Sequence, residues 1–341
     1  PHDLVDLGVA APADAARDRA EVPRLVLPAD ADGLPNVVRP ARPALALVGD
    51  SFTVFGAQQE PPGLQRRLAE RLGVEILNAS ISGIGPDQEL FLLEHVVLPA
   101  RPTLVVWLFF AGNDVIDAFW SQTHRGLGIR TYGELHADRR APRWIVPSLL
   151  AGLFASDSKA VAEPLPGFAL QRDPQRRLWF YPDTLRVMAM APALLTTNPG
   201  WAGIRDVLAR AQAACGAAGS RLLVVYLPSK EQVYAPRVVP APEQLQRFVA
   251  ASSLFAIPVP ADAGELAAAV LQNRGAIESA LRAACAGAGW QYWSATAAIE
   301  SAADAGPLVY YATDSHWRAE AQVATADALA EFILGHDLLR R

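Results

Sequence analysis

Signals for bound metals and cofactors are missing from this sequence of 341 residues. It contains no paired CxxC, no HExxH and no GxGxxG that opens a helix after a strand. The DSH triplet near the C-terminus lacks a third ligand clustered with it, which argues against a metal site there. We therefore expect neither a metal nor a cofactor.

Positive charge and long apolar runs are also scarce. The formal net charge is −5 and Lys and Arg are not concentrated in any region, which argues against DNA or RNA as a partner. The apolar run at 104–110 is far shorter than the roughly 18–20 residues of a membrane span. We expect no membrane span within these residues. Because the chain starts at Pro1 without Met, we also expect a lost N-terminal signal or anchor and a periplasmic or other extracytoplasmic location.

Only two cysteines occur, Cys215 and Cys285, in the similar contexts QAACGAAGS and RAACAGAGW. Each lies near the end of a predicted helix that leads into a strand. They are either two buried small apolar residues or a disulfide between neighbouring helices in an oxidising compartment. Neither is expected to be a nucleophile, since no histidine lies near them in the sequence.

Short apolar runs alternate with amphipathic stretches along most of the chain. The apolar runs cover 44–48, 74–78, 103–110, 221–227 and 290–294. Unbroken runs of this kind are typical of parallel strands covered on both faces. The amphipathic stretches predict helices at 63–73, 203–219 and 276–289, and a closing helix at 317–334. This alternation predicts an α/β fold with a doubly wound, flavodoxin-like and mostly parallel five-stranded sheet.

Domain organisation follows from the segments that break the alternation. Residues 1–40 are expected to form an extended lead-in, and 41–341 one catalytic domain. Two Pro-rich insertions, at about 118–200 and 235–272, are expected to be irregular, and the first to form a lid or rim at the site. Aromatic residues of the first insertion form either a sugar-stacking platform or, as we favour, the core of a small subdomain; they are Trp120, Trp144, Trp179, Phe180 and Tyr181.

Candidate site residues lie shortly after three of the predicted strands. Ser51 follows the first strand in GDSF, and Gly83 follows the second in NASISGIG. Asn113 follows the third in FFAGNDV, where its amide could donate to a developing oxyanion. Open α/β sheets bind their ligands at the carboxyl ends of the strands. Each motif alone is also compatible with an ordinary turn or helix cap.

A carboxylate and an imidazole lie close together just before the closing helix. Asp314 precedes His316 by two residues in YYATDSHWRAEAQ. In an extended or looped segment such residues can share a face, so Asp314 could orient the ring of His316. The alternative is that the acidic residue caps the helix and the histidine is incidental.

Taken together, these four motifs resemble the SGNH (GDSL-like) hydrolase superfamily, which supplies a Ser, a Gly, an Asn and a His in this order. The resemblance implies Ser51, Asp314 and His316 as catalytic residues, and Ser51, Gly83 and Asn113 as the oxyanion hole. It spans roughly 44–116 and 308–334. NASISG followed by GND is similar to the bacterial multifunctional thioesterase and lysophospholipase branch.

The acid and base are spaced differently from the DxxH usual in that superfamily. The string DSHW, from Asp314 to Trp317, resembles the DxHW of alginate O-acetyltransferase-related proteins, although there the Asp and His precede the Ser. Trp317 and Lys230 are candidate substrate contacts. The alternatives are a tryptophan packed at the start of a helix and a solvated surface lysine.

The predicted activity is that of a serine esterase working through an acyl-serine intermediate. The expected substrate is a short acyl ester, acetyl on a carbohydrate, and this expectation comes from the DxHW resemblance. The NASISG similarity leaves a lipid or thioester substrate open instead. Two further alternatives stay open: a polysaccharide O-acetyltransferase using the same Ser, His and Asp, and a non-catalytic glycan-binding protein on the same scaffold.

Overall fold

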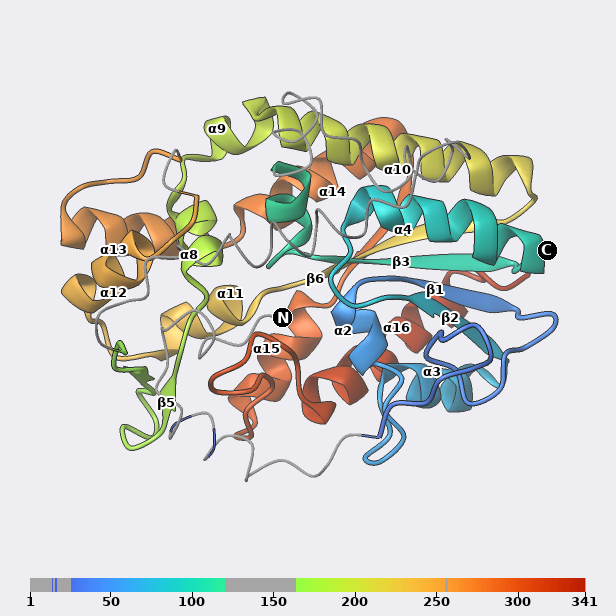
Figure 1. Cartoon of the computed structure of the whole chain (residues 1–341), viewed down its shortest axis with the longest axis horizontal. Helices are drawn as coiled ribbons and strands as arrows, with labels where there is room; N and C mark the ends of the chain where they lie inside the picture. Colours follow the sequence, from blue (N-terminus) through green and yellow to red (C-terminus); the bar gives the residue numbers. More distant parts are fainter. Residues whose placement is uncertain (1–13, 15, 17–25, 120–163, 255–256, 341) are drawn as a thin grey trace, which may run out of the picture.

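The computed structural model describes residues 14, 16, 26–119, 164–254 and 257–340 (Figure 1). A sheet of five strands in the order β2-β1-β3-β6-β7 forms its centre, and every neighbouring pair is parallel. The strands are β1 (Leu45–Gly49), β2 (Ile76–Ser80), β3 (Leu104–Phe110), β6 (Arg221–Leu227) and β7 (Gln291–Ser294). All five apolar runs are therefore strands, and the predicted doubly wound, flavodoxin-like α/β sheet is confirmed.

Helices cover both faces of this sheet, as the alternation predicts. One face carries α3 (Leu64–Leu72), α15 (Thr296–Asp304) and α16 (Ala319–Gly335), and the other α4 (Pro86–Leu92), α10 (Pro199–Ala217) and α14 (Ala276–Ala288) (Figure 1). Successive residues of β1 alternate between the two cores, with Leu45 and Leu47 in the first and Ala46 and Val48 in the second. Because strand side chains point to opposite faces in turn, both faces must be apolar.

The Pro-rich insertions contain more helix than the sequence predicted. Residues 164–200 hold a ribbon of β4 (Phe168–Ala169) and β5 (Arg177–Leu178), followed by α8 (Pro182–Ala189) and α9 (Pro192–Thr197). The second insertion holds α12 (Pro242–Ala250) and α13 (Ala263–Asn273). The expectation of irregular structure is wrong for these stretches. Pro182, Pro192 and Pro242 occupy the first position of their helices, where the missing N–H costs nothing and the fixed φ favours a helix.

Aromatic residues of the first insertion pack inward where they are described. Trp179 is buried and its indole donates to the carbonyl oxygen of Leu165 at 2.9 Å, and the ring of Phe180 stacks on Phe168. Both residues belong to the hydrophobic cluster on one face of the central sheet, so they add to the core of the whole domain and not to that of a separate subdomain. Trp120 and Trp144, with the rest of 120–163, lie outside the described residues.

The two cysteines are free and buried, Cys215 in α10 and Cys285 in α14. The disulfide alternative is therefore not realised. Burial raises the pKa of the Cys215 thiol to about 12 and that of Cys285 to about 11, so both stay protonated and unreactive near neutral pH. In the described part of the chain, no helix has the length and apolar character needed to cross a membrane.

Part of the lead-in lies along the edge strand of the sheet. The Asn36 side chain accepts a hydrogen bond from the main-chain N–H of Asn78 at 2.9 Å and donates to its carbonyl oxygen at 3.0 Å. This pair of bonds continues the ladder of β2 without a further strand. Asn36 thus provides partners for two main-chain polar groups of an edge strand.

Candidate active site

The candidate nucleophile starts a short helix at the carboxyl end of β1. Ser51 is the first residue of α2 (Ser51–Phe55) and is only 3% exposed. Its hydroxyl makes no hydrogen bond to any of the described residues. Asp50 caps the helix by accepting from the main-chain N–H of Phe52 at 2.9 Å. The main-chain N–H of Ser51, in the first turn, has no acceptor within the helix.

Asp50 also ties the end of β1 to the residue that follows β3. Its second carboxylate oxygen accepts from the side-chain amide of Asn113 at 2.8 Å. That amide has a second N–H proton, which Asp50 does not use. The next residue, Asp114, accepts from the main-chain N–H of Phe110 at 2.8 Å and so fixes the end of β3. The sequence motifs did not single out Asp50 as the link between Ser51 and Asn113.

The acid and the candidate base form a close pair. The side-chain oxygen of Asp314 lies 2.6 Å from Nδ1 of His316 and 2.7 Å from its main-chain nitrogen. Burial alone would raise the pKa of the Asp314 carboxyl, but its hydrogen bonds to His316 and the charges of His316 and Lys230 together hold that pKa below its usual range. The carboxylate is thus ionised near neutral pH and can orient the imidazole.

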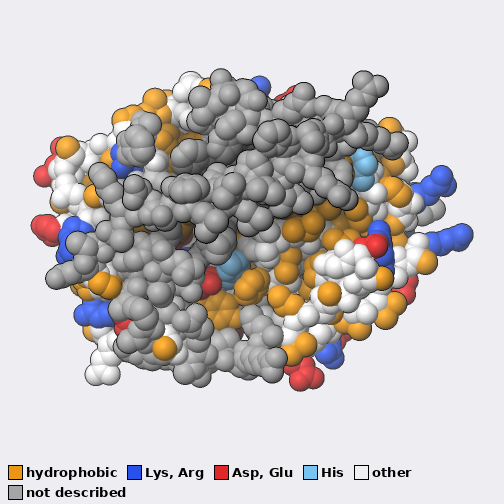
Figure 2. All heavy atoms as spheres, viewed as in Figure 1, with side chains coloured by type: hydrophobic (Ala, Val, Ile, Leu, Met, Phe, Trp, Pro, Cys, Tyr) orange, Lys and Arg blue, Asp and Glu red, His pale blue; other side chains and the backbone are white. Residues whose placement is uncertain are grey.

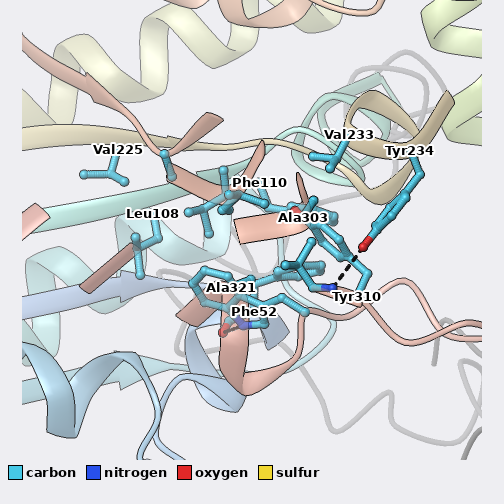
Figure 3. Close-up of a cluster of buried hydrophobic side chains, with 14 of the residues drawn as sticks. Phe52, Leu108, Phe110, Val225, Val233, Tyr234, Ala303, Tyr310 and Ala321 are labelled. Carbon is cyan, nitrogen blue, oxygen red and sulfur yellow. Dashed lines mark hydrogen bonds between the residues drawn. The ribbon is translucent and has the colours of Figure 1, made fainter. Parts of the chain in front are cut away.

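The imidazole of His316 lies against the helix that Ser51 begins. Its ring stacks on Phe55, with centroids 4.2 Å apart and planes 8° apart, and lies 5.1 Å from the ring of Phe52. Phe52 in turn stacks on Phe110 at 3.5 Å, inside the apolar cluster of Figure 3. On the face in Figure 2, a histidine and an acidic side chain are visible near the centre among hydrophobic side chains. The structure thus brings His316 to the helix of Ser51.

The side chain of Trp317 packs in the interior of the protein. It is fully buried, and its indole donates to the carbonyl oxygen of Phe52 at 3.0 Å. Because no part of the indole is exposed, the expected substrate contact is not supported, and the packing alternative describes this residue. The bond joins the segment that carries His316 to the middle of α2.

Lys230 fits neither of the alternatives considered for it. It is fully buried, so the interpretation as a solvated surface lysine is wrong, and no charged tip is offered to a substrate. Its ammonium donates instead to main-chain carbonyl oxygens at Tyr311, Ala312 and Asp314. The sequence could not reveal this because the partners lie more than 80 residues away.

Gly83 lies at the same edge of the sheet, three residues beyond the Ser80 that pairs with Gly49. It is exposed and has a φ of +78°, which favours glycine. Its contribution to an oxyanion hole stays a prediction. The described end of the first insertion also reaches this edge, since the Thr184 hydroxyl donates to the carbonyl oxygen of Gly112 at 3.1 Å.

Four buried carboxyl groups interact near Asn113, and the motif analysis missed two of them. They are Asp50, Glu89, Asp114 and Asp117. Burial raises the pKa of each, and their mutual repulsion adds to this for Glu89, Asp114 and Asp117. One signal was present: Glu89 lies four residues before Leu93 and eight before Val97, on the buried stripe of its helix.

The described residues thus define a doubly wound α/β protein with Ser, His and Asp at the carboxyl edge of its sheet. No protein-family model matches the chain, and neither does any curated protein. The solved structures that match include the crystal structure of TesA, at 16% sequence identity and a TM-score of 0.40, over 86% of this chain and 98% of that chain. A likeness of this degree carries no argument about family or activity.

Glycine is required before Asp50 because a Cβ at Gly49 would lie 2.1 Å from the Thr53 hydroxyl oxygen. We expect Gly49→Ala to displace α2 and to lower the free energy of unfolding by about 1–3 kcal/mol. Adding Thr53→Ala should recover part of this loss, since it removes the clashing atom. Urea unfolding measures both, with Gly216→Ala in α10 as the control, because a Cβ there meets nothing. Additive effects of the two substitutions would contradict the clash.

Asp117 is expected to make stability depend on pH. Burial and the charge of Asp50 raise its pKa to about 7, whereas an aspartate in the unfolded chain titrates near ~3.9. Between these values the folded state binds more protons, so stability falls as pH rises from about 4 to about 7. Asp117→Asn should make this fall smaller. Urea unfolding across this range tests it, with the exposed Asp206→Asn as the control; an unchanged slope in Asp117→Asn would refute the assignment.

Proposed function

We propose that this protein is a serine ester hydrolase of the SGNH type that works through an acyl-serine intermediate. One observation carries the proposal: the pair of Asp314 and His316, joined at 2.6 Å, stacks on the helix that begins with Ser51. A nucleophile, a base and a group that orients the base are the parts required for nucleophilic acyl transfer.

In the proposed first step, His316 takes the proton of Ser51 as the hydroxyl oxygen attacks the ester carbonyl. Because Nδ1 faces Asp314, Nε2 is the ring nitrogen that would accept this proton. The ionised carboxylate stabilises the imidazolium that results, without itself becoming protonated. The imidazolium then protonates the leaving alcohol, and the acyl group stays on Ser51.

The negative charge on the carbonyl oxygen needs donors in place before the reaction. The proposed donors are the main-chain N–H groups of Ser51 and Gly83 and the amide of Asn113. The bond from Asn113 to Asp50 holds this amide in one orientation, and its second proton serves the oxyanion. Losing one such donor typically costs about 10²–10³ in rate.

The proposed substrate is a short acyl ester on a carbohydrate, with water as the acceptor in the second step. Support for acetyl and for a sugar comes from the resemblance of DSHW to O-acetyltransferase-related proteins. The same resemblance motivates the alternative in which a sugar hydroxyl replaces water. The buried Trp317 offers no surface to either acceptor, so this residue does not favour transfer over hydrolysis.

A glycan-binding protein without activity is the alternative from another class. It would not require a carboxylate held below its usual pKa against an imidazole, nor a nearly buried serine hydroxyl. These features have a purpose in proton transfer and none in binding a neutral sugar. We therefore favour the enzyme.

Hydrolysis of p-nitrophenyl acetate tests the catalytic assignment. We expect Ser51→Ala and His316→Gln to lower kcat/KM by about three orders of magnitude or more, and Asp314→Asn to lower it less, because the Asp only orients the base. The exposed Ser301→Ala and His336→Gln are matched controls and should keep wild-type rates. Turnover that persists in Ser51→Ala would reject the acyl-serine mechanism.

Incubation with an acetyl donor and an oligosaccharide distinguishes hydrolase from transferase. We expect free acetate as the main product and a transient mass increase of one acetyl group on Ser51, both seen by mass spectrometry. An acetylated sugar as the main product would replace the hydrolase with the transferase. If no donor acylates Ser51, neither reaction is supported and the binding protein becomes the better account.

A further inference from the structure

A buried lysine lies beside the pair formed by Asp314 and His316. Lys230 is the first residue of α11 (Lys230–Tyr234), which follows the carboxyl end of β6, and its side chain is fully buried. Removing an ammonium group from water costs several kcal/mol unless polar groups replace the lost hydration. The acceptors around Lys230 therefore indicate what its charge does.

Among the residues that the structure describes, these acceptors are main-chain carbonyl groups of a single short stretch. The ammonium donates to the oxygens of Tyr311 and Ala312, both at 3.3 Å, and of Asp314 at 2.9 Å. One cation thereby fixes the backbone of residues 311–314. The same stretch carries the carboxylate that lies 2.6 Å from Nδ1 of His316.

A second contact attaches the same helix to the start of this stretch. The Tyr234 hydroxyl accepts from the main-chain N–H of Val309 at 3.0 Å, drawn as the dashed line in Figure 3. Val309 lies five residues before Asp314, and its bond to Tyr234 does not involve the carbonyl groups that accept from Lys230. The segment therefore keeps one attachment to α11 if the ammonium is removed.

Charged groups interact with Lys230 from its own helix and from the closing segment. Glu231 accepts from the main-chain N–H of Tyr181 at 2.7 Å; burial raises its pKa, and the charge of Lys230 opposes this rise. On the other side, Lys230 helps to keep the pKa of Asp314 low. Burial keeps Tyr310, which interacts with Glu231, protonated. The charge of Lys230 thus acts on two carboxylates, those of Glu231 and Asp314.

We propose that Lys230 is a positioning residue for the acid–base pair: its ammonium holds residues 311–314 on the path that keeps Asp314 against Nδ1 of His316. This rests on the proposed function, in which Asp314 orients the base. Lys230 touches main-chain oxygens and not the reacting atoms, so it acts on the reaction through Asp314 and His316. A neutral side chain of the same length would fill the space but remove the ammonium donor from three carbonyl groups, of which that of Ala312 also accepts from the main-chain N–H of Trp179 at 2.9 Å.

Lys230→Met is the direct test, because methionine is similar in length and lacks both charge and donors. Arg237→Met is the matched control: it removes another cation just after α11, one paired with Asp304 at 2.8 Å and not with residues 311–314. The first readout does not need turnover. In ¹⁵N-labelled protein, the ring-nitrogen shifts of His316, assigned with His316→Gln, report which nitrogen of the neutral ring carries the proton.

The expected result is a proton on Nδ1 in the wild type and in Arg237→Met, held there by Asp314. In Lys230→Met the proton should redistribute toward Nε2. With p-nitrophenyl acetate, kcat should fall about tenfold or more with KM nearly unchanged, because a misplaced base slows chemistry more than binding. The acid limb of the pH profile of kcat/KM should move to higher pH, since the pair takes up a proton more readily without a neighbouring cation.

An unchanged ring tautomer together with unchanged kcat in Lys230→Met would overturn the proposal, as would a wild-type His316 that does not carry its proton on Nδ1. If Lys230→Met changes the tautomer of His316 but the wild type has no esterase activity, the positioning role is supported and the proposed function is rejected. The two hypotheses can therefore fail separately. Lys230→Gln keeps two N–H donors without charge and replaces the methionine variant should that one not fold. Unfolding of both, with Arg237→Met folded, would assign Lys230 to stability alone and reject the proposal.

Discussion

The arrangement of the site depends on one hydrogen bond between distant parts of the chain. The indole of Trp317 donates to the carbonyl oxygen of Phe52, 265 residues away in sequence. This carbonyl oxygen also accepts from the main-chain N–H of Gly56 at 3.0 Å, so the indole adds a second bond that joins the helix to the closing segment. Asn78 provides another partner at Thr53. The nucleophile's helix is therefore held by β2 on one side and by the closing segment on the other.

Buried ionisable groups are the second constraint on the site, and their pKa values are shifted in opposite directions. Four carboxyl groups, one of them next to Ser51 in the sequence, have raised pKa values because they are buried together. Asp314, in contrast, keeps a lowered pKa because His316 supplies hydrogen bonds and both His316 and Lys230 supply positive charge. The same residue type thus behaves oppositely at two places near one site, and the neighbours decide which behaviour occurs.

The sequence was sufficient for the sheet, because apolar runs report burial on both faces directly. It also placed Ser51 and Asn113 near one edge, since the end of a parallel strand is a defined place in the fold. His316 follows no strand of the sheet, and its selection rested on the resemblance to the SGNH hydrolases. Prolines in the insertions were misread, because the same residue ends one helix and begins another. The burial of Lys230 could not be predicted, since it depends on contacts between segments far apart in the chain. The helical stripe indicated that Glu89 is buried, but not that three aspartates lie near it.

The hydrogen bond from Trp317 to Phe52 has a consequence during synthesis of the chain. The residues of β1 and Ser51 leave the ribosome early. The indole of Trp317, which bonds to α2, and the imidazole of His316, the proposed base, emerge more than 260 residues later. Until residues 310–317 leave the ribosome, the helix lacks its bond from the Trp317 indole and the serine has no base. A nascent chain of this protein therefore carries its nucleophile in an incompletely formed site for most of its synthesis, and the site becomes complete only near the end.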